Sequence, residues 1–368
     1  MKSKSILVDC HVFDGGFQGS RTYIEGLYKE FISFKDVNFY FAAQDIENLK
    51  KIFGNESNVH YVKLRFKNKY LRLLYDFPAI IRKHKVEYAH FQYVTPFLKG
   101  CKFVTSTHDV LFLDYPEYFP WGYRISKKWL FYLSSLRSDF VFTGSLYSKL
   151  QIQKHFKIEN VFHTPYGIQS VFFEPYDKEQ VQNEVFEKYG YKDFIVFVSR
   201  REPRKNHLAL LKTFVELSLF TQYWLVFIGD KDLNYKEFDE YYESLNESVK
   251  TKIITLEKLP FLEMVSFIRA SRLCVYPSKA EGFGLPPLES AAARVPTICS
   301  NTTSMGEFDI LSESLVDPYN LEEMKLKMTE KLSELDLSQL NRTSNLIQEK
   351  YNWSAIAKQY YDILFKDA

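Results

Sequence analysis

The sequence predicts an α/β protein built from two doubly wound parallel sheets. The chain has 368 residues, which is long for one hydrophobic core and comfortable for two domains. Short apolar runs typical of buried strands alternate with helical stretches in both halves, and this alternation favours parallel sheets. The alternation stops near residue 168 and restarts near residue 194, after a polar, tyrosine-rich segment. We therefore expect the boundary between the domains near residue 168.

The N-terminal half begins with a strand, a glycine-containing loop and a helix. Ile6–Asp9 predicts the strand, and a helix pattern covers Arg21–Phe31. The loop between them contains Gly15, Gly16 and Gly19. Strand–loop–helix is a common shape of nucleotide sites, but these glycines do not follow the G-x-G-x-x-G spacing. From the residues alone, a structural turn is the favoured interpretation.

Further apolar runs predict the remaining strands of this half. They are Phe39–Ala42, Tyr88–Phe91, Phe103–Thr107, Phe140–Thr143 and Val161–Thr164. His108 and Asp109 follow the end of one of these strands, where open α/β sheets place residues that contact ligands. A histidine that is merely hydrogen-bonded within a loop is the alternative.

A basic segment, Lys63–Arg72, carries five cationic side chains with aromatic and aliphatic residues among them and after them. Residues 1–180 have a net charge of +7, whereas the remainder has −5, which indicates an anionic partner for the first half. The segment is either an element that faces a membrane or an acceptor, or a solvated loop before an ordinary amphipathic helix.

The second half restarts with the strand Phe194–Val198, the basic loop Ser199–Asn206 and a helix pattern over His207–Phe220. Arg200 and Lys205 in this loop are suited to phosphate, because arginine offers a planar fork and lysine a mobile point charge. The alternative is a solvated charged loop. Trp224–Gly229 and Ile253–Leu256 predict two more strands.

The stretch Ser278–Ser300 follows the buried-strand pattern Leu273–Tyr276 and opens a helix near two prolines. Free N–H groups at a helix start attract anions, typically phosphate. Glu281 in the loop and Glu289 in the helix would repel phosphate alone, but each can accept hydrogen bonds from a diol. A sugar nucleotide contains both groups. Ordinary turn chemistry with a solvated helix glutamate is the competing interpretation.

The C-terminal part is predicted to contain a strand, Pro296–Ser300, a polar loop, Asn301–Glu307, and helices over 321–350 and Trp353–Phe365. Four scattered cysteines lack any C-x-x-C pair, so free thiols in a reducing compartment are expected. Neither a signal-peptide core nor an apolar run of about 18 residues is present, which favours a cytoplasmic protein that could bind a membrane peripherally.

Several motifs resemble one known family, the retaining GT-B glycosyltransferases of family GT4. E-G-F-G-L-P-P-L-E, from Glu281 to Glu289, resembles the glutamate pair of that family. R-x4-K followed by N-H-L-A-L-L resembles its diphosphate clamp, and S-T-H-D-V-L-F-L-D-Y-P-E-Y-F resembles the segment whose histidine faces the sugar. G-G-F-Q-G-S-R-T-Y is similar to its N-terminal glycine loop.

The resemblance implies a GT-B fold with three segments: 1–168 as an acceptor domain, 169–350 as a donor domain, and 351–368 as a helix that crosses back to the first domain. It also implies roles for single residues. Arg200 and Lys205 would bind the donor diphosphate, together with the N–H groups of Gly284 and Leu285. His108 and Glu281 would hold the sugar, and Glu289 the ribose. The other implied donor contacts are Gly15, Gly16, Gly19, Lys258, Leu259, Gly282 and Phe283.

The implied reaction transfers a hexose, with retention, from a nucleoside diphosphate sugar to a hydroxyl of a glycan or lipid-linked glycan. GDP-mannose is favoured over UDP-hexoses. Neither a cofactor, a metal nor a nucleic acid is expected, and no paired-aspartate metal motif is present. A sugar-nucleotide epimerase, a phosphorylase and a non-catalytic binding subunit are the alternatives, whereas the N-terminal glycine spacing argues against an NAD-dependent enzyme.

Overall fold

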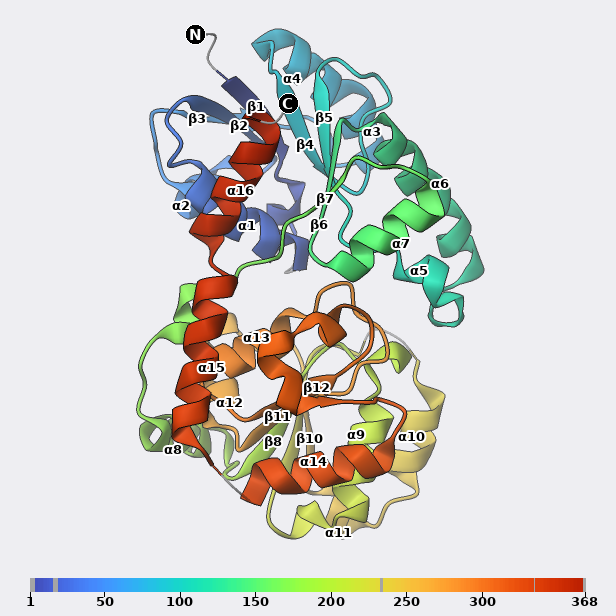
Figure 1. Cartoon of the computed structure of the whole chain (residues 1–368), viewed down its shortest axis with the longest axis vertical. Coiled ribbons are helices and arrows are strands. Elements are labelled where there is room, and N and C mark those ends of the chain that lie inside the picture. Colours follow the sequence, from blue (N-terminus) through green and yellow to red (C-terminus); the bar gives the residue numbers. More distant parts are fainter. Residues whose placement is uncertain (1–3, 16–18, 232–233, 334, 367–368) are drawn as a thin grey trace. The chain divides into compact units, whose positions relative to one another are not determined.

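The computed structural model describes residues 4–15, 19–231, 234–333 and 335–366. The chain divides into two compact units (Figure 1). The first unit combines Met1–Gly167 with Asn352–Ala368, and the second is Ile168–Tyr351. The C-terminal segment therefore belongs to the N-terminal unit. Each unit is described by itself.

The described residues of the first unit contain a seven-stranded parallel sheet with the order β3-β2-β1-β4-β5-β6-β7. The strands are β1 (Lys4–Asp9), β2 (Val37–Ala43), β3 (Val59–Lys63), β4 (Tyr88–Gln92), β5 (Lys102–Ser106), β6 (Phe140–Thr143) and β7 (Val161–His163). β4 and β6 are buried over their whole length, as expected for continuous apolar strands covered on both faces.

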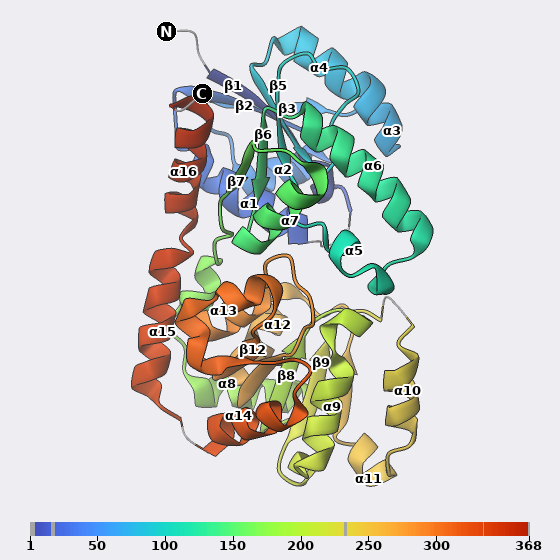
Figure 2. The same ribbon diagram turned by 45° about the vertical axis from the view of Figure 1, so that its right-hand side comes forward.

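Helices surround this sheet (Figures 1 and 2). They are α1 (Gly19–Phe31), α2 (Ile46–Phe53), α3 (Lys69–Leu71), α4 (Phe77–His84), α5 (Leu111–Asp114), α6 (Trp121–Arg137), α7 (Leu146–Phe156) and α16 (Trp353–Phe365). A π-helical turn, Arg72–Asp76, joins α3 to α4. α16 packs beside α1, and its Tyr360 ring stacks on Phe142 of β6 with 4.1 Å between the ring centroids.

The described residues of the second unit contain a six-stranded parallel sheet with the order β10-β9-β8-β11-β12-β13. The strands are β8 (Phe194–Val198), β9 (Trp224–Ile228), β10 (Ile253–Leu256), β11 (Leu273–Tyr276), β12 (Thr297–Ser300) and β13 (Leu315–Val316). The helices are α8 (Lys178–Tyr189), α9 (His207–Glu216), α10 (Lys236–Glu243), α11 (Glu247–Lys250), α12 (Phe261–Ala270), α13 (Leu285–Ala292), α14 (Leu321–Ser333) and α15 (Leu337–Lys350).

The two doubly wound parallel sheets confirm the predicted fold class. Several elements differ from the prediction, among them three in the second unit. The helix expected to reach Phe220 ends at Glu216, because Ser218 adopts a left-handed φ of 52°. The loop expected at Asn301–Glu307 contains a 3-10 turn at Thr303–Glu307. The helical stretch 321–350 consists of two helices, the second of which is capped by Asp336.

Each sheet has a topological switch point, where the strand order reverses direction. The reversal lies between β1 and β4 in the first unit and between β8 and β11 in the second. Open α/β sheets bind ligands beyond the carboxyl ends of the strands at such points. The loops that follow β8 and β11 are therefore the natural place for a ligand site in the second unit.

Candidate active site

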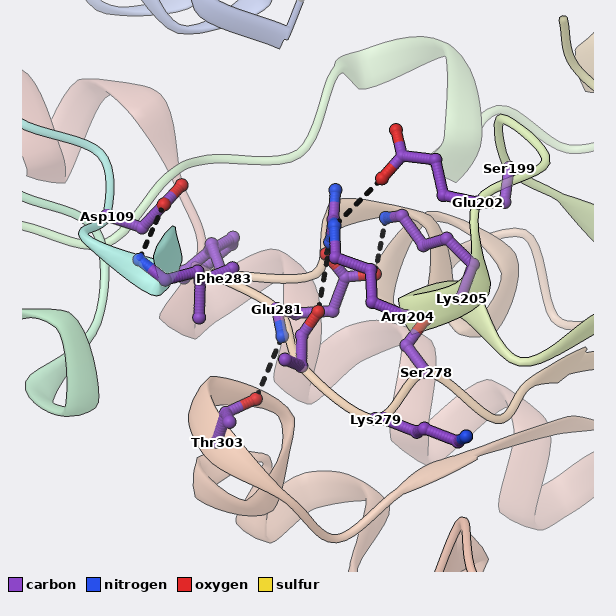
Figure 3. A network of polar contacts seen from close by, with 12 residues as sticks. Asp109, Ser199, Glu202, Arg204, Lys205, Ser278, Lys279, Glu281, Phe283 and Thr303 are labelled. Carbon is purple, nitrogen blue, oxygen red and sulfur yellow. Dashed lines mark hydrogen bonds and ion pairs between the residues drawn. The ribbon is translucent and has the colours of Figure 1, made fainter. Parts of the chain in front are cut away.

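The basic loop after β8 and the glutamate loop after β11 meet at the switch point of the second unit. The Nζ atom of Lys205 lies 2.5 Å from Oε1 of Glu281, and a terminal nitrogen of Arg204 lies 3.2 Å from Oε2 of the same carboxylate. Figure 3 shows the three side chains converging from their two loops. Two residues that the sequence places 76 positions apart, Lys205 and Glu281, thus form one ion pair.

Local backbone geometry aims the basic loop at this point. Pro203–Lys205 forms a 3-10 turn, and Asn206 then adopts a left-handed φ of 63° before α9 begins. The side-chain amide of Asn206 donates to the carbonyl of Pro318 at 2.8 Å, which anchors the turn. The N–H of Lys279 donates to the carbonyl of Arg204 at 2.7 Å, so the two loops are also joined through their backbones.

The glutamate loop is held by the turn that follows β12. The N–H of Glu281 donates to Oγ1 of Thr303 at 3.0 Å. The hydroxyl of Ser304 donates to the carbonyls of Glu281 and Phe283, at 2.8 and 2.9 Å. Gly284 then turns the chain into α13 with a φ of +95°, a conformation that disfavours residues with a side chain.

Burial and charge act in opposite directions on both partners of the Lys205–Glu281 pair. Burial alone would raise the pKa of Glu281, but the charges of Lys205 and Arg204 outweigh it and lower this pKa to about 2. Burial lowers the pKa of Lys205, and the Glu281 carboxylate opposes this effect. Arg204 adds a second positive charge beside Glu281.

Arg200 and Arg204 share a second carboxylate, Glu202. Arg200 contacts one oxygen of Glu202 at 3.2 Å, and Nε of Arg204 contacts the other at 2.8 Å. The side chain of Arg200 is 60% exposed, whereas that of Arg204 is largely buried. Sequence reasoning singled out Arg200 and Lys205, but Arg204 is the arginine that the structure places against Glu281.

Glu289 lies one turn into α13 and is 9% exposed. Among the described residues, its carboxylate has no hydrogen-bond or ion-pair partner. Burial raises its pKa to about 7. Pro286 and Pro287 have no N–H, so the backbone donors at this helix start are those of Gly284 and Leu285. The carboxylate oxygens of Glu289 are therefore available to accept hydrogen bonds from a ligand.

The remaining predicted donor contacts of the second unit are Gly282, Phe283, Lys258 and Leu259. Gly282 lies in the glutamate loop beside Phe283, whose ring is buried against Phe308 and Tyr351 and is part of the core. Lys258 is exposed, and both Lys258 and Leu259 follow β10, which β9 separates from β8. They share the sheet edge with the clamp but not its immediate neighbourhood.

In the first unit, Gly15 and Gly19 flank the loop between β1 and α1, whereas Gly16 lies outside the described residues. A side chain added at Gly15 or Gly19 would meet no atom within 4 Å. Neither glycine is therefore required by packing in the described structure.

His108 follows β5 and is half-buried. Its Nε2 lies 2.8 Å from Oε1 of Gln92, and its Nδ1 hydrogen-bonds the hydroxyl of Tyr166. Burial lowers the pKa of His108 to about 4, so the ring is neutral at neutral pH. Burial keeps the Tyr166 pKa well above its usual value. The tyrosine hydroxyl therefore donates a hydrogen bond to Nδ1. Nε2 carries the ring proton and donates a hydrogen bond to Oε1 of Gln92.

Sequence reasoning missed Gln92 and Tyr166 as partners of His108. Gln92 ends β4 at the switch point of the first sheet, a position that the strand-end rule could have identified. Tyr166 lies 58 residues from His108 and shows no sequence signal for this contact.

In the part of the chain that the structure describes, no group of three or more His, Cys, Asp and Glu side chains is arranged to hold a metal ion. The four cysteines are free, and three of them are buried. Among the same residues, no helix has both the length and the apolar character needed to cross a bilayer.

Comparisons with known proteins agree with this architecture. Residues 178–353 match the family model described as glycosyl transferases group 1. The chain is 26% identical over 265 residues to the O-antigen chain mannosyltransferase B of Escherichia coli, covering 70% of this chain and 68% of that protein. It spans only 22% of the length of other mannosyltransferases of Escherichia coli that it matches.

Two solved structures share the fold over almost the whole chain. The sucrose-phosphate synthase of Thermosynechococcus elongatus aligns with a TM-score of 0.78 at 16% identity, covering 99% of this chain and 100% of that one. Anabaena HepE, solved with UDP and glucose, aligns with a TM-score of 0.72 at 13% identity and the same coverage of both chains.

Two parallel α/β units, with a cation–glutamate cluster at the switch point of the second, define a protein of the GT-B fold class. Within that class, residues 178–353 match the group 1 glycosyl transferases, and the chain is a glycosyltransferase.

Proposed function

We propose that this enzyme transfers mannose from GDP-mannose, with retention of configuration, to a hydroxyl group of a glycan or lipid-linked glycan acceptor in surface polysaccharide synthesis. The names of the E. coli relatives support the sugar and the pathway, since one is an O-antigen chain mannosyltransferase and another a serotype-specific mannosyltransferase. The cluster of Lys205, Arg204 and Glu281, together with the unpartnered Glu289 one turn into α13, is the observation that carries the proposal.

Negative charge develops on the diphosphate as the sugar departs. Lys205 lies in the loop at the switch point, where its ammonium is fixed by Glu281 before any ligand arrives. A preorganised cation stabilises developing charge without having to reorganise during the reaction. Arg200 and the N–H groups of Gly284 and Leu285 would complete the clamp. Retention would follow from a front-face displacement, in which the leaving phosphate helps to deprotonate the acceptor.

The carboxylates would bind the alcohol groups of the donor. Each oxygen of Glu281 accepts one contact from Lys205 or Arg204, and a carboxylate oxygen can accept a second hydrogen bond. Glu281 can therefore hold sugar hydroxyls without releasing the clamp. Glu289 has no such partner in the described structure, and we assign it the ribose diol.

His108 is assigned to orienting the sugar. Its neutral ring has a defined tautomer, with Nδ1 held by Tyr166 and Nε2 by Gln92. A contact with a sugar hydroxyl would therefore require exchange of one of these two hydrogen bonds. We also assign donor contacts to Gly15, Gly16 and Gly19 in the N-terminal glycine loop.

UDP-hexose is the second candidate donor, because HepE, which shares the fold, was solved with UDP and glucose. The free cysteines support a reducing, cytoplasmic location for the enzyme.

A thermal-shift screen of GDP, UDP, dTDP and their sugars tests the donor. A ligand that binds the folded protein stabilises it by RT ln(1 + [L]/Kd), so GDP and GDP-mannose should raise Tm most. A transfer assay with the selected donor then tests the reaction. Stabilisation by UDP alone would overturn the choice of GDP-mannose. Donor conversion without an acceptor would indicate an epimerase, and phosphate-dependent cleavage a phosphorylase. Binding without turnover would indicate a non-catalytic subunit.

A further inference from the structure

Helix α6 in the first unit exposes large apolar side chains, whereas a helix on a protein surface is expected to expose polar ones. Its exposed side chains include Trp121, Ile125, Trp129, Leu133 and Leu136. These residues recur every three or four positions and therefore form a stripe along one face of the helix. The buried residues of α6 are one phenylalanine and two serines. A soluble protein rarely leaves such a stripe in water unless the stripe has a partner.

The stripe continues onto neighbouring segments of the same unit. α3 and the π-helical turn expose Tyr70, Leu71, Leu74 and Tyr75, and the loop after β4 exposes Phe97 and Leu98. Figures 1 and 2 both show α3 next to α6. The guanidinium of Arg137, at the end of α6, lies 4.7 Å from the ring centroid of Phe97. These side chains therefore belong to one region, which we call the aromatic–cationic face.

The charged residues of this face are almost all positive. Residues 119–138, which contain α6, include no Asp or Glu. Residues 63–85 include one acid, Asp76, which is buried and paired with Arg65 at 2.7 Å. Lys99, in the loop, is paired with Asp139 at 2.8 Å. The exposed and half-buried cations of the two segments and the loop are Lys63, Arg65, Lys67, Lys69, Arg82, Lys83, Lys85, Lys99, Arg124, Lys127, Lys128 and Arg137.

We propose that the aromatic–cationic face docks on the surface of an anionic phospholipid bilayer. Tryptophan and tyrosine favour the boundary between headgroups and acyl chains, where an aromatic body and a polar tip are both satisfied. Lysine and arginine are attracted to anionic headgroups, and an apolar helical face can be buried at the same boundary. α6, with 17 residues, is about 25 Å long and would lie in the plane of the bilayer.

Charge complementarity selects this occupant over a second copy of the chain. A symmetric dimer through this face would place the same cations opposite one another. An anionic bilayer instead neutralises them all at once. The proposal goes beyond the transfer reaction, since lipid binding by this face requires neither the donor nor the clamp.

Sedimentation of the full-length protein with vesicles tests the proposal. We expect binding to vesicles of phosphatidylcholine mixed with phosphatidylglycerol, little binding to pure phosphatidylcholine, and loss of binding as salt is added. Lys127→Gln/Lys128→Gln should weaken partitioning about 30-fold, given the attraction of each cation to an anionic surface. Trp121→Ser/Trp129→Ser should weaken it about tenfold or more, through lost apolar burial.

Leu326→Ser is the matched control, because Leu326 on the second unit is 73% exposed, as is Trp121. It should leave vesicle binding unchanged. An unchanged thermal transition of the first unit would show that each variant is folded. Three results would overturn the proposal: no sedimentation with anionic vesicles, equal binding to both kinds of vesicle, or a dimer in solution that Trp121→Ser/Trp129→Ser dissociates. A failed transfer assay would leave the vesicle result standing, so the two proposals fail separately.

Discussion

The cation that matters most at the residue scale is Lys205, because Glu281 fixes its ammonium beside the switch point of the second sheet. Its side chain is only 16% exposed, so water screens its charge weakly. Arg200 lies in the same loop but is mostly exposed and paired with Glu202. Because Lys205 is buried and Arg200 is exposed, we expect Lys205 to contribute more than Arg200 to stabilising the charge on the diphosphate.

Lys205→Ala should lower kcat by about 100-fold or more, as expected when a contact to developing charge is lost. The measurement is transfer at saturating donor. Lys192→Ala is the control, since Lys192 is exposed and precedes β8 at the opposite end of the strand. Arg200→Ala should cost less than Lys205→Ala. A Lys205→Ala enzyme with the wild-type kcat would exclude the clamp.

The raised pKa of Glu289 makes the free energy of unfolding depend on pH. The direction of this dependence is opposite to that of a paired carboxylate, whose pKa is lowered. Its pKa in the folded protein is about 7, above its ordinary value of 4.5, so the folded state binds the proton more tightly than the unfolded state. The free energy of unfolding should therefore fall as the pH rises from about 4.5 through 7. The full shift corresponds to at most about 3 kcal/mol.

Glu289→Gln removes this cost, so urea unfolding at pH 8 should find the second unit of the variant more stable than that of the wild type. The difference should vanish near pH 4. Donor affinity, measured by calorimetry, should fall in the same variant because an acceptor for the ribose is lost. Glu257→Gln, at an exposed position after β10, is the control for both measurements. Equal donor affinity would reject the ribose role.

At the scale of elements, the backbone turn that starts α13 requires the glycine that precedes the helix, Gly284. Gly284 has a φ of +95°, and a Cβ there would lie 2.7 Å from Cγ of Met305. Gly190 also has a positive φ, of 79°, but a Cβ there would meet no atom within 4 Å. A substitution at Gly190 would therefore cause backbone strain alone, whereas a substitution at Gly284 would cause both strain and a steric clash.

Gly284→Ala should destabilise the second unit by more than Gly190→Ala, for which backbone strain alone predicts about 1–2 kcal/mol. Gly284→Ala should also weaken binding of the nucleoside diphosphate, because the donors at the helix start would move. Thermal unfolding with and without the nucleotide measures both effects. Equal nucleotide affinity in the two variants would show that the start of α13 does not bind the diphosphate.

The elements also show what could be predicted from the sequence. Continuous apolar runs such as Phe194–Val198 and Phe140–Thr143 identified buried strands at their observed positions. β3 was missed because this edge strand, Val59–Lys63, is only partly buried and mixes apolar and polar residues. β13 has two residues and therefore too short a pattern. The π-helical turn after α3 has no composition signal that distinguishes it from an α-helix.

The site was predictable where the contacts follow strand order and unpredictable where they depend on loop geometry. Strand ends placed Lys205, Glu281 and His108 where open sheets bind ligands, and the resemblance to the GT4 motifs supplied their expected roles. The contact of Arg204 with Glu281 depends on the 3-10 turn Pro203–Lys205, which aims the side chain. The hydrogen bond between Tyr166 and His108 arises only when β5 and the segment after β7 come together in the folded sheet.

At the scale of the whole molecule, the first unit is built from both ends of the chain. Trp353 of α16 packs on Gly26 and Gly167, where a Cβ would lie 2.2 and 2.5 Å from its ring. The hydroxyl of Tyr88 in β4 donates to the carbonyl of Leu364 at 3.0 Å. The second unit, by contrast, is continuous from Ile168 to Tyr351. Removing the C-terminal segment therefore affects the two units differently.

A chain truncated after Tyr351 should lose the stability of the first unit and keep that of the second. The buried large side chains of α16 are Trp353, Ile356, Tyr360 and Leu364. At about 1.5–3 kcal/mol each, their burial contributes about 6–12 kcal/mol, which is comparable with the whole stability of a domain. Thermal unfolding should show an early transition that the donor nucleotide does not shift, followed by a later transition that it does. A single transition at the full-length temperature would mean that α16 is dispensable to the first unit.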